Sequence, residues 1–99
     1  MDFLPAVVRA EYRGGYQIRL FFNDGLVKTT DFAEWLNGPV FQPLKDQEYF
    51  RRFFVDGGTV TWPNGADIAP ETLYAAAGEV EERPAAERGV AADEASPRS

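Results

Sequence analysis

The chain has 99 residues and a formal net charge of −6, so we expect a single small domain with an acidic surface. This charge balance argues against direct binding to nucleic acid, because phosphate recognition requires a basic surface. The chain contains neither Cys nor His, which excludes disulfides and thiol catalysis and removes the most usual general base and metal ligand. The sequence begins without a leader-like segment and has no apolar run of membrane length, so we expect a cytoplasmic protein.

Aromatic residues and acidic residues divide the chain into two parts. Eight Phe, four Tyr and two Trp all fall between Phe3 and Tyr74, and large aromatic side chains supply much of the burial energy of a small domain. Residues 78–99 are mainly acidic residues, Ala, Gly, Pro and Ser, and offer too little apolar surface to offset the entropy of ordering. We therefore expect a folded domain over residues 1–77 and a disordered acidic tail over residues 78–99. The tail is either a solvated extension or a segment that folds on a basic partner.

Three segments in the first third of the chain have the pattern of β-strands: residues 6–13, 16–22 and 26–32. Tight turns are predicted between them at Gly14-Gly15 and at Asn23-Asp24-Gly25, since glycine accepts positive φ at little cost. The result is a three-stranded antiparallel meander with one apolar face. That face requires a cover.

Two short helices predicted in the middle of the chain would pack against this apolar face. Residues 32–36 have the spacing of a short helix that Asp31 can cap, and a second helix is predicted from about Asp46 to Phe53. Residues 40–44, between the two helices, are expected to be extended.

Residues 54–56 and 59–62 then predict a second hairpin across Gly57-Gly58, and a helix start is predicted near Pro70. The expected fold is α+β: a small antiparallel sheet built from a three-stranded meander and a second hairpin, covered by two or three short helices.

The most specific motif is the run from Trp62 to Tyr74, Trp-Pro-Asn-Gly-Ala-Asp-Ile-Ala-Pro-Glu-Thr-Leu-Tyr. Together with the earlier Phe22-Asn23-Asp24-Gly25 turn, it resembles the small bacterial family DUF2442 over roughly residues 5–76. The resemblance implies a compact α+β domain of unassigned biochemical function. Some members of that family carry a helix-turn-helix domain after this module. Others are encoded beside a DUF4160-type protein in an arrangement that looks like a toxin–antitoxin pair. The present sequence has only the acidic tail after Tyr74.

The residues of this signature are expected to serve the fold. They are Asp24, Gly25, Trp62, Pro63, Asn64, Gly65, Asp67, Pro70, Glu71, Leu73 and Tyr74. Trp62 is predicted to be a core residue at the end of a strand, with an aromatic surface for a ligand or a partner as the alternative. Asp67 is predicted to accept backbone N–H groups at the turn and Glu71 to serve the helix N-terminus. The alternative is a carboxylate site for a cation or small ligand, formed by these two residues with Asp24.

No catalytic residue, cofactor or metal site is predicted. The preferred hypothesis is a non-catalytic protein-interaction module that receives a partner segment at an exposed sheet edge or in an aromatic groove beside the signature. By resemblance, the partner is a DUF4160-type protein encoded by an adjacent gene, towards which this chain acts as an antitoxin-like or regulatory protein. The alternatives are a small-ligand or cation-binding module and a transcription-associated module that lacks its own DNA-binding domain. A homodimer through short edge strands is also compatible with the sequence.

Overall fold

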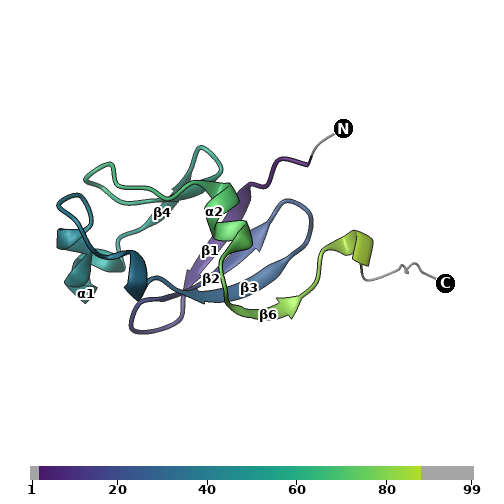
Figure 1. Ribbon diagram of the computed structural model, residues 1–99, viewed down its shortest axis with the longest axis horizontal. Coiled ribbons are helices and arrows are strands. Elements are labelled where there is room, and N and C mark those ends of the chain that lie inside the picture. The colour runs from purple at the N-terminus through teal and green to yellow at the C-terminus, as the bar shows by residue number, and fades with distance from the viewer. Residues whose placement is uncertain (1–2, 88–99) are drawn as a thin grey trace.

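A computed structural model describes residues 3–87 of the chain (Figure 1). Its main sheet is antiparallel and has four strands in the order β1-β2-β3-β6, and β4 and β5 form a separate two-stranded sheet. The strands are β1 (Val7–Tyr12), β2 (Gln17–Phe22), β3 (Val27–Asp31), β4 (Phe54–Asp56), β5 (Thr59–Thr61) and β6 (Glu79–Glu82). The helices are η1 (Ala33–Trp35), η2 (Gln42–Lys45), α1 (Gln47–Phe50), α2 (Pro70–Ala75) and η3 (Ala85–Glu87). The predicted α+β class is confirmed.

The first three strands form the predicted meander. Gly14, Gly15 and Gly25 have φ angles of 103°, 55° and 94°, a region that L side chains rarely occupy. At the second turn, the Gly25 N–H donates to the Phe22 carbonyl at 3.0 Å. The turn chemistry therefore sets the register of the meander.

The side chains of β2 show how the two faces of the main sheet differ. Ile18, Leu20 and Phe22 are buried on the core face, as their alternation predicts. Gln17 and Arg19 alternate with them on the opposite face, which is polar. One face of the sheet is thus packed and the other is solvated, as is common in antiparallel sheets.

The β4–β5 hairpin forms where the sequence predicts it but does not join the ladder of the meander. One backbone hydrogen bond links it to β1, from the Val7 N–H to the Gly58 carbonyl at 2.8 Å. Strand β1 has a register shift between Val7 and Arg9 at this point. A bulge of this kind increases the local twist and disfavours a continuous ladder along the strand edge.

The helical cover is shorter and more irregular than expected. Asp31 Oδ1 accepts the Ala33 N–H at 2.9 Å, as predicted for this turn. The second helix begins near Asp46 as predicted, and Asp46 Oδ1 accepts the Glu48 N–H at 3.1 Å, a cap that was not predicted. The expectation that residues 40–44 are extended is wrong, because they enter η2, whose first turn contains Pro43 with its helix-compatible φ. The predicted second helix ends at Phe50 rather than Phe53.

Within residues 3–87, no helix is long and apolar enough to span a bilayer.

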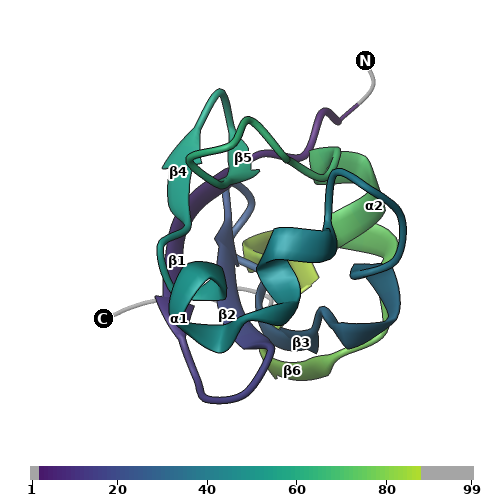
Figure 2. The ribbon, with the colours of Figure 1, turned by 90° about the vertical axis from the view of Figure 1, so that its left-hand side faces the viewer.

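The core centres on three aromatic side chains from different parts of the chain. Phe32, Phe50 and Trp62 are each fully buried, and the Phe50 and Trp62 ring centroids lie 5.6 Å apart. Leu44 and Leu73 pack into the same cluster from η2 and α2. Figure 2 shows α1 in front of β2 and the β4–β5 hairpin above it. The irregular cover is thus held by one aromatic cluster.

Regular structure continues beyond residue 77, where the folded domain was predicted to end. Glu79–Glu82 form β6, which pairs antiparallel with β3, and η3 follows. Figure 1 shows β6 along the outer edge of the sheet, beside β3. The prediction relied on apolar burial, whereas an edge strand can be held by backbone hydrogen bonds and polar side chains. The rest of the predicted tail, residues 88–99, lies outside the described residues.

Candidate functional site

Trp62 is a structural residue in this fold. It follows directly after β5 and has no exposed surface. Its Nε1 donates to the Phe50 carbonyl at 2.8 Å, so the indole N–H is satisfied inside the core. This geometry confirms the prediction of a core tryptophan and excludes a role as an exposed aromatic platform.

The Pro63-Asn64-Gly65 segment is the predicted turn. The Trp62 N–H donates to the Ala66 carbonyl at 2.9 Å, and Gly65 has a φ of 86°. Asn64 Oδ1 accepts the Ala66 N–H at 3.0 Å, and its Nδ2 donates to the Val40 carbonyl at 3.1 Å. Asn64 therefore ties the turn to the distant loop before η2, a contact that the sequence does not reveal.

Glu71 lies at the start of α2, where it was predicted, whereas the side chain of Asp67 does not cap that helix. The N-cap of α2 is Ala69, which makes no side-chain cap hydrogen bond because alanine has no acceptor. Glu71 lies in the first turn, where its charge suits the helix dipole. Asp67 is exposed and makes a backbone bridge with Thr61. Neither carboxylate lines the two hollows described below.

Asp24, the third carboxylate of the alternative cation site, has other partners. Its Oδ1 accepts the Leu26 N–H at 3.0 Å, and its Oδ2 accepts the Tyr74 hydroxyl at 2.5 Å. The hydrogen bond to this carboxylate, followed by burial and the negative charge of Asp24, raises the pKa of Tyr74 to about 12. Within residues 3–87, no group of three or more acidic side chains is arranged to hold a metal ion.

Lys28 is a residue that the sequence analysis missed. It is only 3% exposed, and its Nζ donates to the backbone carbonyls of Tyr74 and Ala76 at 2.7 and 2.6 Å. Burial lowers the pKa of this amino group. Lys28 thereby satisfies the carbonyls at the end of α2 and holds that helix against β3. The available signal was its position in phase with the inward-facing Thr30.

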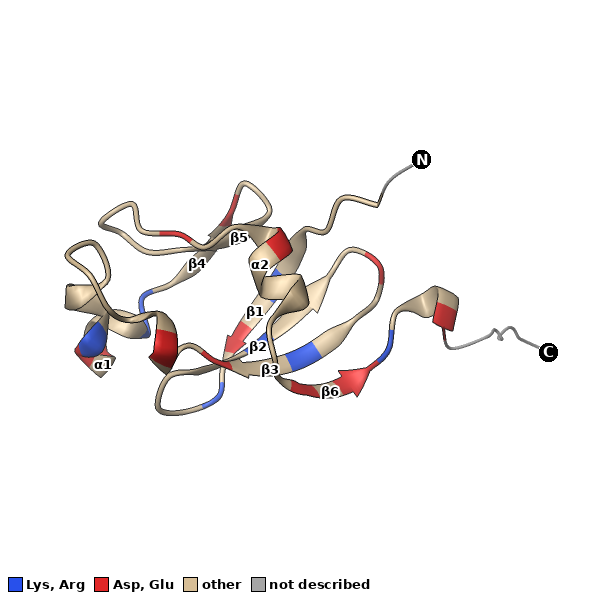
Figure 3. Ribbon diagram, viewed as in Figure 1, with Lys and Arg blue, Asp and Glu red and all other residues tan. Residues whose placement is uncertain are grey.

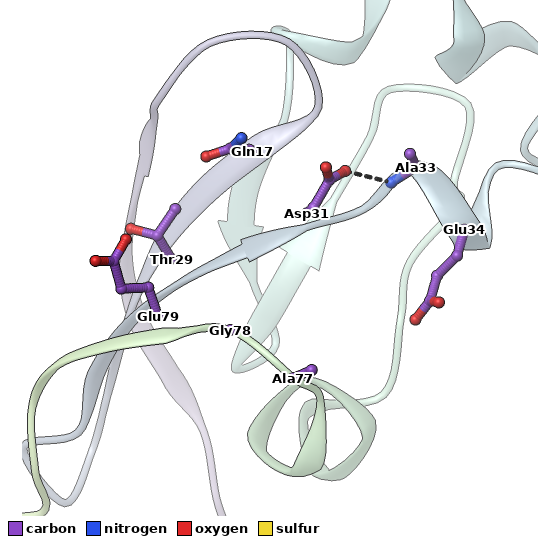
Figure 4. Close-up of a pocket in the computed structure, with 8 residues that line it drawn as sticks. All are labelled: Gln17, Thr29, Asp31, Ala33, Glu34, Ala77, Gly78 and Glu79. Atoms are coloured by element: carbon purple, nitrogen blue, oxygen red, sulfur yellow. Dashed lines mark hydrogen bonds between the residues drawn. The ribbon is translucent and has the colours of Figure 1, made fainter.

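An acidic hollow lies at the end of the β3–β6 ladder. Its volume is about 510 Å³, and Figure 4 shows Thr29 and Glu79 on one side of it, with Asp31 and Glu34 across from them. The complete lining is Gln17, Thr29, Asp31, Ala33, Glu34, Ala77, Gly78 and Glu79. Three carboxylates and no basic side chain line it, so it would favour a positively charged group.

The strand beside this hollow is the outer edge of the main sheet. All four residues of β6 are exposed, and three of them are glutamates. Figure 3 shows these acidic positions in a row along β6. In the described part of the chain, the sheet order ends at β6, so β3 is its only strand neighbour. An edge strand presents backbone groups on which another strand can pair.

The two faces of β6 differ in chemistry. Glu81 accepts the Thr29 hydroxyl at 2.8 Å and lies 2.9 Å from Arg19 Nε, on the polar face of the sheet. Val80 pairs with Lys28 and faces the opposite side, where it lines a second hollow of about 340 Å³. The other lining residues are Leu26, Tyr74, Arg83, Pro84 and Glu87. The edge is thus acidic on one face and largely apolar on the other.

Comparison with known proteins gives one match. A family model described as "Protein of unknown function (DUF2442)" matches residues 7–79, from the first residue of β1 to the first residue of β6. No curated protein and no solved structure matches the chain. The family match covers the meander, the aromatic core and the whole signature, well over half of the sequence. The chain therefore belongs to the DUF2442 family.

Proposed function

We propose that this protein is a non-catalytic interaction module that binds a basic segment of a partner protein along the outer edge of β6. The observation that carries the proposal is the acidic edge itself: β6 has a strand neighbour on one side only within residues 3–87, and it presents Glu79, Glu81 and Glu82. Main-chain hydrogen bonding at such an edge supplies affinity, and the side chains along it supply specificity.

The charge around β6 supports a basic partner. Asp31 and Glu34 extend the acidic surface from Glu79 around the hollow at the end of the ladder. Complementary charge raises the association rate and disfavours partners of the wrong sign. A partner segment rich in Lys or Arg would therefore be selected over an acidic or neutral one.

The signature residues support a binding role rather than a catalytic one. Trp62 and Asn64 hold the turn and the core, and Asp24 bonds to Tyr74. Asp67 and Glu71 are exposed and lie outside both hollows. These contacts account for Trp62, Asn64, Asp24 and Tyr74 through folding, which makes the β6 edge the better candidate for function.

In this proposal the partner is a DUF4160-type protein encoded by an adjacent gene, and the chain neutralises or regulates it. This part rests on the gene arrangement of some DUF2442 members. It is tested by co-expressing the chain with the product of its adjacent gene and measuring co-elution by size exclusion with light scattering.

Co-elution at micromolar concentration, weakened by salt, is the expected result. Two separate peaks at that concentration, at low as well as moderate salt, would contradict the proposal. A matched pair of variants shows whether β6 takes part. Glu79→Lys reverses a charge on the edge, and Glu71→Lys makes the same change on α2, also at an exposed position. Only the first should reduce co-elution.

A further inference from the structure

The β6 edge also specifies the sequence pattern of what it binds. We propose that β6 accepts an added β-strand in which basic residues alternate with apolar ones, with an apolar residue opposite Val80 and a basic residue on either side of it. This inference rests on the proposed function, because it describes the segment that the same edge would bind.

The alternation follows from the register of β6 on β3. Val80 pairs with Lys28, and Glu79 pairs with Thr29. The register then shifts so that Glu82 pairs with Val27, and the alternation is therefore taken for Glu79 to Glu81 only. Successive side chains of a strand point to opposite faces, so Val80 faces one side and Glu79 and Glu81 face the other. A strand added to the outer edge continues this alternation, and its side chains lie next to residues of the same face.

On the face of Val80, the side chains next to it are mainly apolar. Val80 is 52% exposed and lines the hollow of about 340 Å³ with Leu26, Tyr74 and Pro84, and Arg83 and Glu87 complete the lining. An apolar side chain on the added strand would cover this surface, and its burial is favourable in proportion to the apolar area removed from water. A charged side chain at that position would lose hydration against the apolar wall.

On the opposite face, the surface around the acidic hollow is negative. Glu79 lines this hollow with Asp31 and Glu34, whereas Glu81, one strand position beyond Val80, is already paired with Arg19 at 2.9 Å. Opposite charges on directly adjacent strand positions stabilise the pair, and like charges destabilise it. The long side chains of Lys and Arg can reach the carboxylates while their stems cover the strand.

The same rule disfavours a second copy of the chain as the occupant. Pairing β6 with β6 of another molecule would place glutamates of both strands side by side on a short ladder. A partner strand with basic residues at those positions meets attraction instead, so charge complementarity selects a partner different from this chain.

The test uses the full-length, ¹⁵N-labelled chain and capped synthetic peptides, followed by amide chemical shifts. The alternating peptide is Thr-Lys-Val-Arg-Val-Lys-Thr. The control peptide, Thr-Lys-Lys-Arg-Val-Val-Thr, has the same composition and charge without the alternation. We expect the alternating peptide to shift the amide signals of Glu79–Glu82 and Leu26, and to bind about tenfold more tightly than the control peptide.

Three changes sharpen the result. N-methylation of alternate backbone nitrogens in the peptide should abolish binding if the added strand pairs through its main chain. Glu79→Lys should weaken binding at least about fivefold, whereas Glu71→Lys, a matched charge reversal on α2, should change it less than about twofold. Val80→Asp should weaken the alternating peptide and leave the amide spectrum of the core unchanged.

Equal binding of the two peptides, shifts centred on another strand such as β4, or no shift at millimolar peptide would each overturn the inference. The last result would mean that the glutamates serve only to guard the edge against self-association. These failures differ from failure of the proposed function. If the adjacent gene product co-elutes with the Glu79→Lys variant as well as with the wild type, the chain binds a partner elsewhere. If the alternating peptide binds but no partner protein co-elutes, the inferred sequence pattern of the added strand is supported and the proposed function is contradicted.

Discussion

The signature region and the C-terminal arm, residues 78–87, are neighbours in space but are held by different forces. The signature region, from Thr59 to Tyr74, places Trp62 and Leu73 in the core with no exposed surface. The arm has no buried residue, and its largest apolar side chain, Val80, is half exposed. Buried apolar area dominates the stability of a small domain, so the signature region belongs to the stable core.

The arm is held by main-chain pairing and surface polar contacts instead. Its links include the ladder to β3, the contacts of Glu81 with Arg19 and Thr29, and the Ala85 N–H donated to the Asp24 carbonyl at 2.7 Å. Surface ion pairs contribute little to global stability. We expect the arm to open at a lower free energy than the core, which would suit the binding role proposed for β6.

The largest effect should come from Trp62→Ala. Loss of a fully buried tryptophan side chain leaves a cavity and should lower the free energy of unfolding by about 3–5 kcal/mol. Chemical denaturation measured by circular dichroism checks this value. Trp62→Phe is the matched variant: it keeps most of the ring but leaves the Phe50 carbonyl without its donor, so it should cost less than Trp62→Ala.

A cost below about 1 kcal/mol for Trp62→Ala would show that the signature region is not part of the stable core. The proposed difference in stability between the signature region and the arm would then be wrong.

Gly78→Ala tests whether the arm and the core open independently. A Cβ at this position would lie 2.6 Å from the Thr29 carbonyl oxygen and 2.7 Å from Thr30 Oγ1, so the backbone of the arm or of β3 must shift. We expect a global loss of about 1–3 kcal/mol and a larger rise in amide exchange at β6 than at β2. Ala77→Ser, at the preceding position, is the control. Uniform exchange changes in both strands would indicate that arm and core open together.

The contrast also shows which parts of the molecule could be predicted from sequence. The meander and hairpin follow from local glycine chemistry, and the burial of Phe32, Phe50 and Trp62 follows from strand and helix periodicity. Strand β6 could not be predicted in this way, because its pairing depends on contacts between residues about fifty positions apart. The same holds for Asp24 with Tyr74 and for buried Lys28, whose partners are supplied only by tertiary packing.

A smaller effect is expected where the two regions meet, at Asp24. Its carboxylate accepts the Tyr74 hydroxyl, and its backbone carbonyl accepts the N–H of Ala85 in the arm. Tyr74→Phe removes the first contact and should cost about 1 kcal/mol at neutral pH. Because the folded-state pKa of Tyr74 is raised from 10.0 to about 12, this stabilisation is present below pH 10 and is lost as the pH rises through about 12.

The tyrosinate absorbance, measured as a difference between the wild type and Tyr74→Phe, checks the midpoint. Asp24→Asn should move that midpoint back towards 10, because the neutral amide stabilises the protonated phenol less. A midpoint near 10 in the wild type would contradict the hydrogen bond. A rise in amide exchange at η3 in Tyr74→Phe would show that the two regions are coupled through Asp24.

The smallest global effect should come from Glu81→Gln. Glu81 is exposed, and the Thr29 hydroxyl, together with Arg19, holds the pKa of its carboxyl below the ordinary value. Its contribution is therefore present above the ordinary carboxyl pKa and declines as the pH falls through the lowered value. The midpoint of chemical denaturation should be unchanged, while amide exchange in β6 should rise relative to the wild type. Glu79→Gln, on the same strand, should leave both quantities unchanged. If Glu81→Gln lowered the denaturation midpoint as much as Gly78→Ala does, the arm would unfold together with the core. Strand β6 could then not open independently of the rest of the domain.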